Sequence, residues 1–253
     1  MSVPSAAGDD KFHLSVLSVG RILTASMDAW YLWDSGPGDP AWNMAVDEVL
    51  LEQIAELGRP VLRFYGWTRP AATFGYFQHF APLATLTSVR PLIRRPTGGG
   101  LVPHLDDWTY SVTVPPAHPW YHLTATASYQ RIHEWLRRGF RQAGVATALA
   151  PCCDPAGPGQ CFVGAEKSDL LWGAHKIAGA AQRRNRHGLL IQGSVQPPPP
   201  GLLRPDWQAA VIRVGPDEAA RRFDSFAPSS QLLDFVKARA AERYASPSYN
   251  QRR

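Results

Sequence analysis

The segment 94–104 (RRPTGGGLVPH) holds the densest group of residues that could bind a ligand. Its centre consists of three consecutive glycines: Gly98, Gly99 and Gly100. Without Cβ atoms, this backbone can adopt positive φ angles and approach a ligand closely. Converging backbone N–H groups then bind a carboxylate, an oxyanion or a phosphate, and Arg94 and Arg95 add fixed positive charge. The spacing matches neither a Walker loop nor a dinucleotide fingerprint. We therefore predict a shaped, anion-binding loop, with a flexible turn and solvated arginines as the alternative.

Lys176 begins a segment of apolar and small residues, 176–182 (KIAGAAQ), in which an ammonium group can serve two purposes. It can stabilise the negative charge that develops on the oxygen of a reacting carbonyl. Alternatively, its stem packs against the protein while its head reaches water. The small residues Gly179 and Ala180 would leave room for an acyl chain beside the lysine.

Cys161, fifteen positions before Lys176, is the candidate nucleophile. A thiolate can attack a thioester and hold the acyl group covalently, which divides one transfer into two easier steps. A nearby ammonium group favours the thiolate because it lowers the thiol pKa. The alternative role for Cys161 is that of a small, half-buried hydrophobic residue.

The remaining polar candidates are less specific. His104 follows the glycines and could be a donor or proton shuttle at a pocket mouth, or a residue that packs the loop. A basic run could dock an acidic carrier protein or form a solvated hairpin; it comprises Arg183, Arg184, Arg186 and His187. Cys152 and Cys153 have no evident role, and their spacing to Cys161 fits no common zinc pattern, so we predict no metal site.

Hydrophobic spacing and turn residues predict the elements that must position these groups. Asp39-Pro40 supplies an N-cap and a first-turn proline for a helix that ends at Gly58. A second helix begins near Thr124 and ends at Gly144. Another helix is expected over 231–244. β-rich segments bounded by turn residues predict strands at 30–33, 61–67, 71–77, 91–96, 109–114, 169–172, 176–182 and 188–195.

Strands interleaved with helices, without regular βαβ alternation, predict an α+β fold with a mixed, largely antiparallel sheet flanked by helices. Along the chain we expect three parts: a loosely ordered leader over 1–28, a single catalytic domain over 29–245 and a frayed tail over 246–253.

Composition excludes several classes of protein. The chain has 253 residues, of which 45% are hydrophobic and 19% charged, as in ordinary globular proteins. No window approaches the roughly 18 apolar residues of a membrane span, and residues 14–24 make a poor signal peptide, so we expect a cytoplasmic protein that binds no membrane. The formal net charge of +5 suits acidic partners. Aromatic residues are not interleaved with lysine and arginine, so we expect no nucleic-acid partner.

The motif RRPTGGGLVPH, followed by DWTYSV, resembles the superfamily of lipoate–protein ligases, octanoyltransferases and biotin ligases. Further blocks resemble that superfamily in the same order: 42–48 (WNMAVDE), 63–67 (RFYGW), 73–78 (TFGYFQ) and 176–182. Together the blocks span about residues 30–196, and the Gly-Arg-Gly-Arg-type loop of biotin ligases is absent. The resemblance implies the catalytic fold shared with class II aminoacyl-tRNA synthetases and biotin ligases.

The resemblance also implies that the glycine loop and the lysine strand enclose an acyl chain and its activated carboxyl group. Carried over residue by residue, Lys176 lies at the carbonyl. The positions that line the acyl pocket are Arg95, Thr97, Gly98, Gly99, Gly100, Leu101 and His104.

The Cys161-Phe162 pair before the lysine strand resembles the cysteine-dependent, lipoate ligase-like octanoyltransferases. The older type of octanoyltransferase places its cysteine after that strand. The resemblance therefore implies a cofactor-free octanoyltransferase of lipoate biosynthesis. Its donor would be octanoyl-acyl carrier protein, its intermediate a thioester on Cys161, and its acceptor a lysine of a lipoyl domain or a glycine cleavage H-type protein.

Two alternatives stay open. An adenylating lipoate–protein ligase would use the same loop and Lys176 to hold an acyl-adenylate, with ATP and magnesium. Such ligases usually have an Asn-Asp pair where this chain has Ser168-Asp169, and many carry a C-terminal accessory domain. A non-catalytic acyl-binding paralogue is the other alternative, and the presence of Cys161 and Lys176 argues against it.

Overall fold

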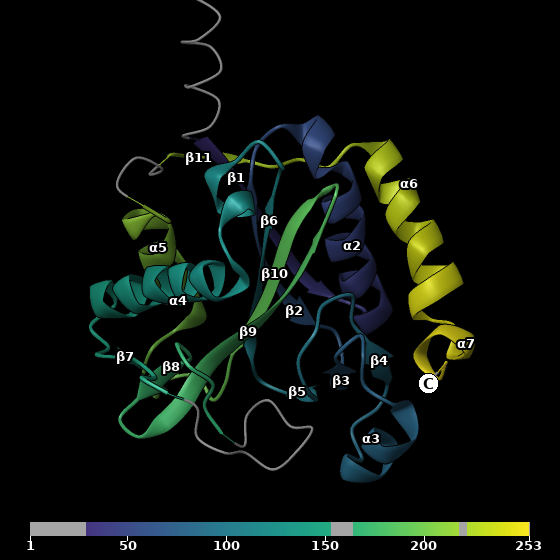
Figure 1. Cartoon of the computed structure of the whole chain (residues 1–253), viewed down its shortest axis with the longest axis horizontal. Coiled ribbons are helices and arrows are strands. Elements are labelled where there is room, and N and C mark those ends of the chain that lie inside the picture. Colours follow the sequence, from purple (N-terminus) through teal and green to yellow (C-terminus); the bar gives the residue numbers. More distant parts are fainter. Residues whose placement is uncertain (1–28, 153–163, 218–221, 253) are drawn as a thin grey trace, which may run out of the picture.

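The computed structural model describes residues 29–152, 164–217 and 222–252. A central eight-stranded sheet runs through the molecule in the order β11-β1-β2-β6-β10-β9-β8-β7 (Figure 1). Its strands are β1 (Ala29–Gly38), β2 (Val61–Trp67), β6 (Trp108–Val114), β7 (Ala148–Leu149), β8 (Leu170–Trp172), β9 (His175–Asn185), β10 (Gly188–Val195) and β11 (Arg222–Ser225). β1 pairs in parallel with β2 and with β11, and the other pairs are antiparallel. The predicted α+β fold with a mixed, largely antiparallel sheet is confirmed.

Two helices cover each face of this sheet, and each pair closes a separate hydrophobic core (Figure 1). α2 (Pro40–Leu57) and α6 (Ser230–Arg239) pack on one face. α4 (Ala125–Gln142) and α5 (Arg204–Val214) pack on the other, where Trp30, Trp135 and Trp207 are fully buried. The layers place β9, the predicted lysine strand, against α4 and beside β10.

Local sequence signals set the helix ends. The Asp39 side chain accepts a hydrogen bond from Ala41 N at 3.0 Å, and Gly58 ends α2 in the left-handed region with φ 69°. The Thr124 hydroxyl accepts from Ala127 N at 3.2 Å at the start of α4. These caps confirm the predicted helix starts, because each satisfies a backbone N–H that the first turn leaves without an intrahelical partner.

A small second sheet carries the glycine loop. Its order is β4-β3-β5, with β4 (Leu92–Arg94), β3 (Ala71–Phe74) and β5 (Val102–His104), and α3 (Phe80–Leu86) lies beside it (Figure 1). The loop 95–101 joins β4 to β5. The sheet therefore anchors both ends of the loop, and Leu101 packs into its small core with Phe74 and Leu92.

The C-terminal residues differ from the predicted frayed tail. α6 continues into a π-helical turn (Ala240–Tyr244), and α7 (Pro247–Asn250) follows it. A short 3₁₀ helix (Pro119–His122) also lies between β6 and α4. The Asn250 side chain accepts from Arg94 N at 2.9 Å, and Asn250 O accepts from Arg94 Nη2 at 3.1 Å. This prediction was wrong because a polar composition does not reveal a long-range contact that buries Asn250 beside β4.

Within the described ranges, no helix is both long and apolar enough to cross a membrane. The predicted leader, 1–28, lies outside the described residues.

Candidate functional site

A chain of buried polar contacts holds the glycine loop against the large sheet. Thr97 Oγ1 donates to Gln192 Oε1 at 2.8 Å, and Gln192 Nε2 donates to Asp47 Oδ2 at 2.7 Å. Asp47 Oδ1 pairs with Arg63 Nη1, also at 2.8 Å, and both of these side chains are buried. Thr97 is therefore connected to β10, α2 and β2, and this wall of the site has a fixed shape.

The backbone of the loop lies directly on the end of β3. A Cβ atom placed on Gly75 would lie 1.9 Å from Gly99 O, so only glycine permits this approach. Gly99 has φ +82°, as the sequence predicted for a shaped loop, whereas a Cβ on Gly98 would meet open space. Gly100 is half-buried. Of the three glycines, Gly99 thus shapes the loop and Gly98 faces free volume.

The two arginines of the motif bind protein groups. Arg95 Nη2 donates to Gly98 O at 2.5 Å and its Nε donates to Thr97 Oγ1 at 3.2 Å. Arg94 Nη1 donates to Gln78 O at 2.7 Å and to Tyr76 O at 2.8 Å. Both side chains are buried. Arg95 stiffens the loop from inside, and Arg94 ties it to the segment after β3 and to α7.

His104 is buried in a network below the loop. Its Nδ1 lies 2.8 Å from Asp107 Oδ2, its Nε2 lies 2.9 Å from Thr73 Oγ1, and its ring stacks on Trp67 with centroids 4.0 Å apart. Burial acts to raise the pKa of Asp107, but the contacts from His104, Ser194 and other donors outweigh it and lower that pKa. Of the two predicted roles, this geometry favours the loop-packing one.

Lys176 has a buried partner that the sequence analysis did not identify. Its Nζ lies 2.7 Å from Asp169 Oδ2, with the side chains 7% and 0% exposed. Asp169 Oδ2 also accepts from Glu166 N at 2.7 Å, and Oδ1 accepts from the Tyr129 hydroxyl on α4. The sequence signals for Asp169 were its position directly before the apolar strand β8 and its place in the Ser168-Asp169 pair, and neither predicted the contact with Lys176.

The small residues beside the lysine make close contacts with the protein, and their predicted role in leaving room for an acyl chain stays a prediction. A Cβ on Gly179 would lie 2.8 Å from Lys176 Cε and 3.0 Å from its Nζ, so Gly179 makes room for the lysine itself. Ala180 is half-buried, and its backbone N–H donates to the Tyr129 hydroxyl at 3.4 Å. We therefore assign to Gly179 the placement of the ammonium group.

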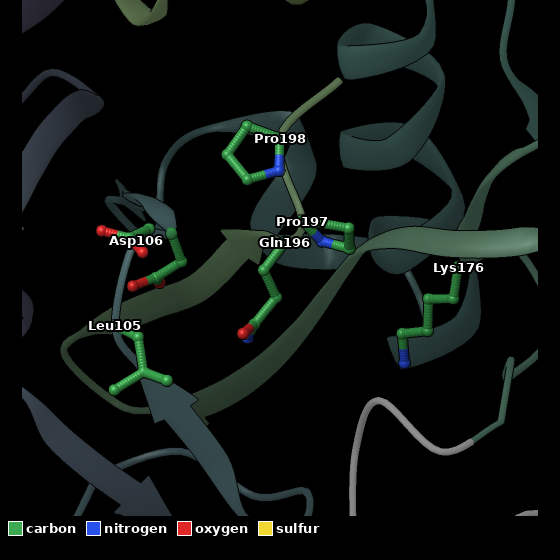
Figure 2. A pocket seen from close by; sticks show the side chains of 7 residues that line it. Leu105, Asp106, Lys176, Gln196, Pro197 and Pro198 are labelled. Atoms are coloured by element: carbon green, nitrogen blue, oxygen red, sulfur yellow. The ribbon is translucent and has the colours of Figure 1, made fainter. Parts of the chain in front are cut away.

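One pocket brings the lysine strand and the segment after the glycine loop together. Lys176 and Gln196 project into it from adjacent segments, joined by the bond from Gln196 N to Ile177 O at 2.8 Å, and Leu105 and Asp106 lie opposite (Figure 2). Its volume is about 320 Å³, and its lining is Leu105, Asp106, Asp107, Lys176, Gln196, Pro197 and Pro198. Of the predicted site residues, Lys176 lines this pocket, while Arg95, Thr97 and His104 support the structure around it.

Cys161 and Cys153 lie outside the described residues, and Cys152 is exposed. Among the described side chains, no cluster of histidine, cysteine and carboxylate groups could hold a metal ion.

The basic run lies at the end of the β9–β10 hairpin. Arg183 approaches Glu48 at 3.7 Å, Arg184 donates to Tyr121 O, and Arg186 and His187 bond to each other at 3.2 Å. Half of the run is thus engaged with the protein, and Arg186 remains on the exposed turn.

Comparison with known proteins shows to which family this chain belongs. Residues 39–196 match the lipoyl protein ligase A/B catalytic domain. Octanoyltransferase LipM of Bacillus subtilis is 31% identical over 275 residues, covering 89% of this chain and 99% of that protein. LipM of Halalkalibacterium halodurans is 35% identical over 182 residues, covering 67% of this chain and 66% of that relative, which is just under two thirds of its length.

A solved structure shows the same fold. A protein of T. acidophilum described as a lipoate protein ligase, with bound lipoic acid, superposes with a TM-score of 0.74 at 20% identity, covering 89% of this chain and 100% of that one. This chain therefore has the fold of that structure, and its pocket joins the lysine strand to the segment after the glycine loop. This chain belongs to the lipoyl protein ligase A/B catalytic domain family.

Proposed function

We propose that this protein is an octanoyltransferase of lipoate biosynthesis that works by a two-step, ping-pong route. The observation that carries the proposal is the Lys176 ammonium group, held by a buried carboxylate at a pocket that the segment after the glycine loop also lines. The two relatives described above are octanoyltransferases, which supports the same transfer here. A fixed positive charge at such a pocket stabilises the oxyanion of an acyl-transfer intermediate.

In the first step, the Cys161 thiolate attacks the carbonyl carbon of an octanoyl thioester. The carbonyl oxygen becomes negatively charged, the carbon–sulfur bond to the carrier breaks, and the carrier leaves as a thiol after taking up a proton. The octanoyl group is now bound to Cys161. Lys176 supplies the positive charge that faces the oxyanion, because its Nζ is held at 2.7 Å from Asp169 and cannot rotate freely.

In the second step, the neutral ε-amine of an acceptor lysine attacks the Cys161 thioester. An amide bond forms, the carbon–sulfur bond breaks, the amine loses a proton and Cys161 returns to its thiol or thiolate form. We propose octanoyl-acyl carrier protein as the donor and a lipoyl-domain or glycine cleavage H-type protein as the acceptor, in the cytoplasm. The net charge of +5 suits such acidic carriers. The route needs no cofactor.

Intact-mass spectrometry tests the first step directly. The protein is incubated with octanoyl-acyl carrier protein without ATP, and the expected result is an adduct heavier by one octanoyl group. Cys161→Ser should form no adduct, while Cys152→Ser, the matched control at the exposed neighbouring cysteine, should form it as the wild type does.

Three outcomes contradict the proposal, each in a different way. Transfer to the acceptor that occurs only with ATP and magnesium indicates an adenylating ligase. Neither adduct nor transfer, with or without ATP, indicates a non-catalytic acyl-binding protein. An adduct that persists in Cys161→Ser and disappears in Cys152→Ser moves the nucleophile to Cys152.

A further inference from the structure

The Asp169 carboxylate is the centre of a small buried network behind the Lys176 ammonium group. Both of its oxygens are in use: Oδ2 accepts from Lys176 Nζ and from Glu166 N, each at 2.7 Å, and Oδ1 accepts from the Tyr129 hydroxyl. The carboxylate is fully buried. With donors on both oxygens, it cannot rotate without breaking a hydrogen bond to a charged acceptor, and such bonds are stronger than neutral ones.

Tyr129 contacts Asp169 from α4, whereas Lys176 and Glu166 contact it from β9 and from the turn before β8. It projects from α4, and its hydroxyl also accepts from Ala180 N at 3.4 Å, so it connects α4, Asp169 and β9. Burial and the negative charge of Asp169 raise the pKa of Tyr129, which keeps the phenol a neutral donor. The orientation of the carboxylate is thereby set by α4 as well as by the turn before β8.

The other titratable groups that face this network are neutral near pH 7. His133, one turn along α4, packs edge-on against Tyr129 with ring centroids 4.4 Å apart, and burial lowers the pKa of His133 to about 4. On β6, burial and the charge of Asp169 raise the pKa of Tyr110. Near this carboxylate, therefore, His133 adds no positive charge that would compete with Lys176, and Tyr110 adds no negative charge.

The turn before β8 directs Asp169 inward. Asp169 N donates to Glu166 O at 2.9 Å and Ser168 N donates to Ala150 O at 2.9 Å. Ser168 has φ 71°, in the left-handed region that a residue with a Cβ atom seldom adopts. A conformation of this cost persists where surrounding contacts fix it, and such sites are often functional.

We infer that Tyr129 is a positioning residue that acts through Asp169 to hold the Lys176 ammonium group at its place in the pocket. The inference rests on the proposed acyl transfer and names a further residue for it. Tyr129 itself lines no part of the pocket. Tyr129 affects the reaction through the position of the Lys176 ammonium group. Gly179 leaves room for that group, and the Tyr129–Asp169 contact fixes the carboxylate that holds it.

Tyr129→Phe removes one hydroxyl and keeps the ring that packs against His133. The matched control is Tyr121→Phe, which removes the hydroxyl that donates to Asn185 O at 3.0 Å at the far end of β9. We expect Tyr129→Phe to lower kcat for octanoyl transfer about tenfold, because a small displacement of a charged group weakens its contact with the transition state. The KM for the carrier should stay within about twofold of wild type, and Tyr121→Phe should leave both constants within about twofold.

A double-mutant cycle with Asp169→Asn tests the route of the effect. If Tyr129 acts through Asp169, adding Tyr129→Phe to Asp169→Asn changes kcat by less than about twofold, whereas independent roles give the full product of the two losses. The thermal unfolding midpoint of each variant is measured to check that the variant is folded at the assay temperature. An independent, structural role of Tyr129 would give multiplicative losses and overturn the inference.

The experiment separates the inference from the proposed function. A wild-type protein that transfers no octanoyl group without ATP contradicts the proposed function. An active wild type with Tyr129→Phe equal to Tyr121→Phe contradicts only the positioning role. A rise in KM at unchanged kcat also contradicts that role, because it places Tyr129 in carrier binding.

Discussion

Two buried ion pairs lie near the site, and they differ in the groups around their cations. Asp47–Arg63 lies behind the glycine loop and Asp169–Lys176 lies behind the pocket, each with an N–O distance near the ideal for a charged hydrogen bond: 2.8 Å and 2.7 Å. Both carboxylates are fully buried. The cations differ in what they face, and we propose that this difference separates a structural pair from a functional one.

Arg63 uses its guanidinium group entirely on the protein. Besides Asp47, it donates to Ser35 Oγ at 2.9 Å and to Asn43 Oδ1 at 2.8 Å, and it lies over the Tyr65 ring at 4.0 Å. Asp47 in turn accepts from Ser111 Oγ at 2.7 Å. Because these contacts fix both side chains of the Asp47–Arg63 pair, the pair is a rigid support for Thr97 and the glycine loop.

Lys176 is less enclosed and its head lies at the pocket. An ammonium group carries three donors, so it can hold a carboxylate and also direct its positive charge toward a ligand in the pocket. The comparison teaches that the loop side contributes shape and the lysine side contributes charge. Substitutions on the first should cost stability, and substitutions on the second should cost rate.

The largest effect is expected for Lys176→Met, which keeps the apolar stem and removes the charge. Octanoyl transfer should slow by about 10²–10³-fold, as when one donor to an oxyanion is removed. Single-turnover transfer followed by intact mass measures this rate. The control Lys237→Met removes an exposed lysine that pairs with exposed Asp234, and it should leave the rate unchanged. Equal activity of both variants would remove Lys176 from the mechanism.

Arg63→Met tests the structural side of the comparison. It should destabilise the protein by about 3 kcal/mol, because it leaves the Asp47 charge buried with neutral donors only. Arg69→Met is the matched control, since Arg69 pairs with Asp39 at the surface with side chains 57% and 48% exposed, and such pairs contribute at most about 1 kcal/mol. Urea denaturation measures both losses.

The transfer rate of Arg63→Met tests whether this pair affects stability alone. Below its own unfolding transition, the folded fraction should transfer octanoate at a rate close to that of wild type. A loss of rate as large as that of Lys176→Met, without a loss of stability, would show that Arg63 takes part in the chemistry and would end the distinction between the two pairs.

The sequence predicted the elements around these pairs better than the pairs themselves. Caps such as Asp39 and Thr124 act over three residues, so spacing alone reveals them. Strand periodicity located β9 and β10 for the same reason. By contrast, the Tyr129–Asp169 contact joins residues forty positions apart, and the Asn250–Arg94 contact joins residues further apart still. Only the tertiary fold brings such groups together, so local signals revealed neither the Tyr129–Asp169 contact nor α7.

The same limit applies to the site residues. Glycine spacing predicted a shaped loop, and Gly75 and Gly99 show the close approach that requires it. The sequence could not tell that His104 and Arg95 bond inward, because donor-rich side chains serve ligands and backbones equally well. Cys161 lies outside the described residues, and its role stays a prediction.

Acid should weaken the lysine side of the molecule first. The pKa of His133 falls from its usual 6.5 to about 4 on folding, so the unfolded chain binds more protons between those two values. The contribution of His133 to the free energy of unfolding is therefore fully present above about pH 6.5 and is lost as pH falls toward 4. About 2 kcal/mol of it is lost at pH 5. His133→Leu should flatten the curve of unfolding free energy against pH by that amount, measured by urea denaturation at several pH values.

His118 titrates in the same direction, with a pKa lowered to about 4 mainly by burial, so some acid sensitivity should remain in His133→Leu. His118 packs against Trp120 and against Trp30 on β1, whereas Lys176 lies on β9, four strands away from β1 in the sheet. If His133→Leu keeps the full wild-type slope, the acid-sensitive group lies elsewhere than beside Tyr129.

The smallest effect concerns the turn that aims Asp169. Ser168 adopts φ 71°, which a Cβ atom makes unfavourable by about 1 kcal/mol and which glycine adopts freely. Comparing Ser168→Gly with Ser168→Ala isolates this term, because both remove the hydroxyl and only alanine keeps the Cβ. The glycine variant should be about 1 kcal/mol more stable in urea denaturation. Two variants of equal stability would mean that the turn relaxes at no cost, and the positive φ would then be no sign that contacts around Asp169 fix the carboxylate behind Lys176.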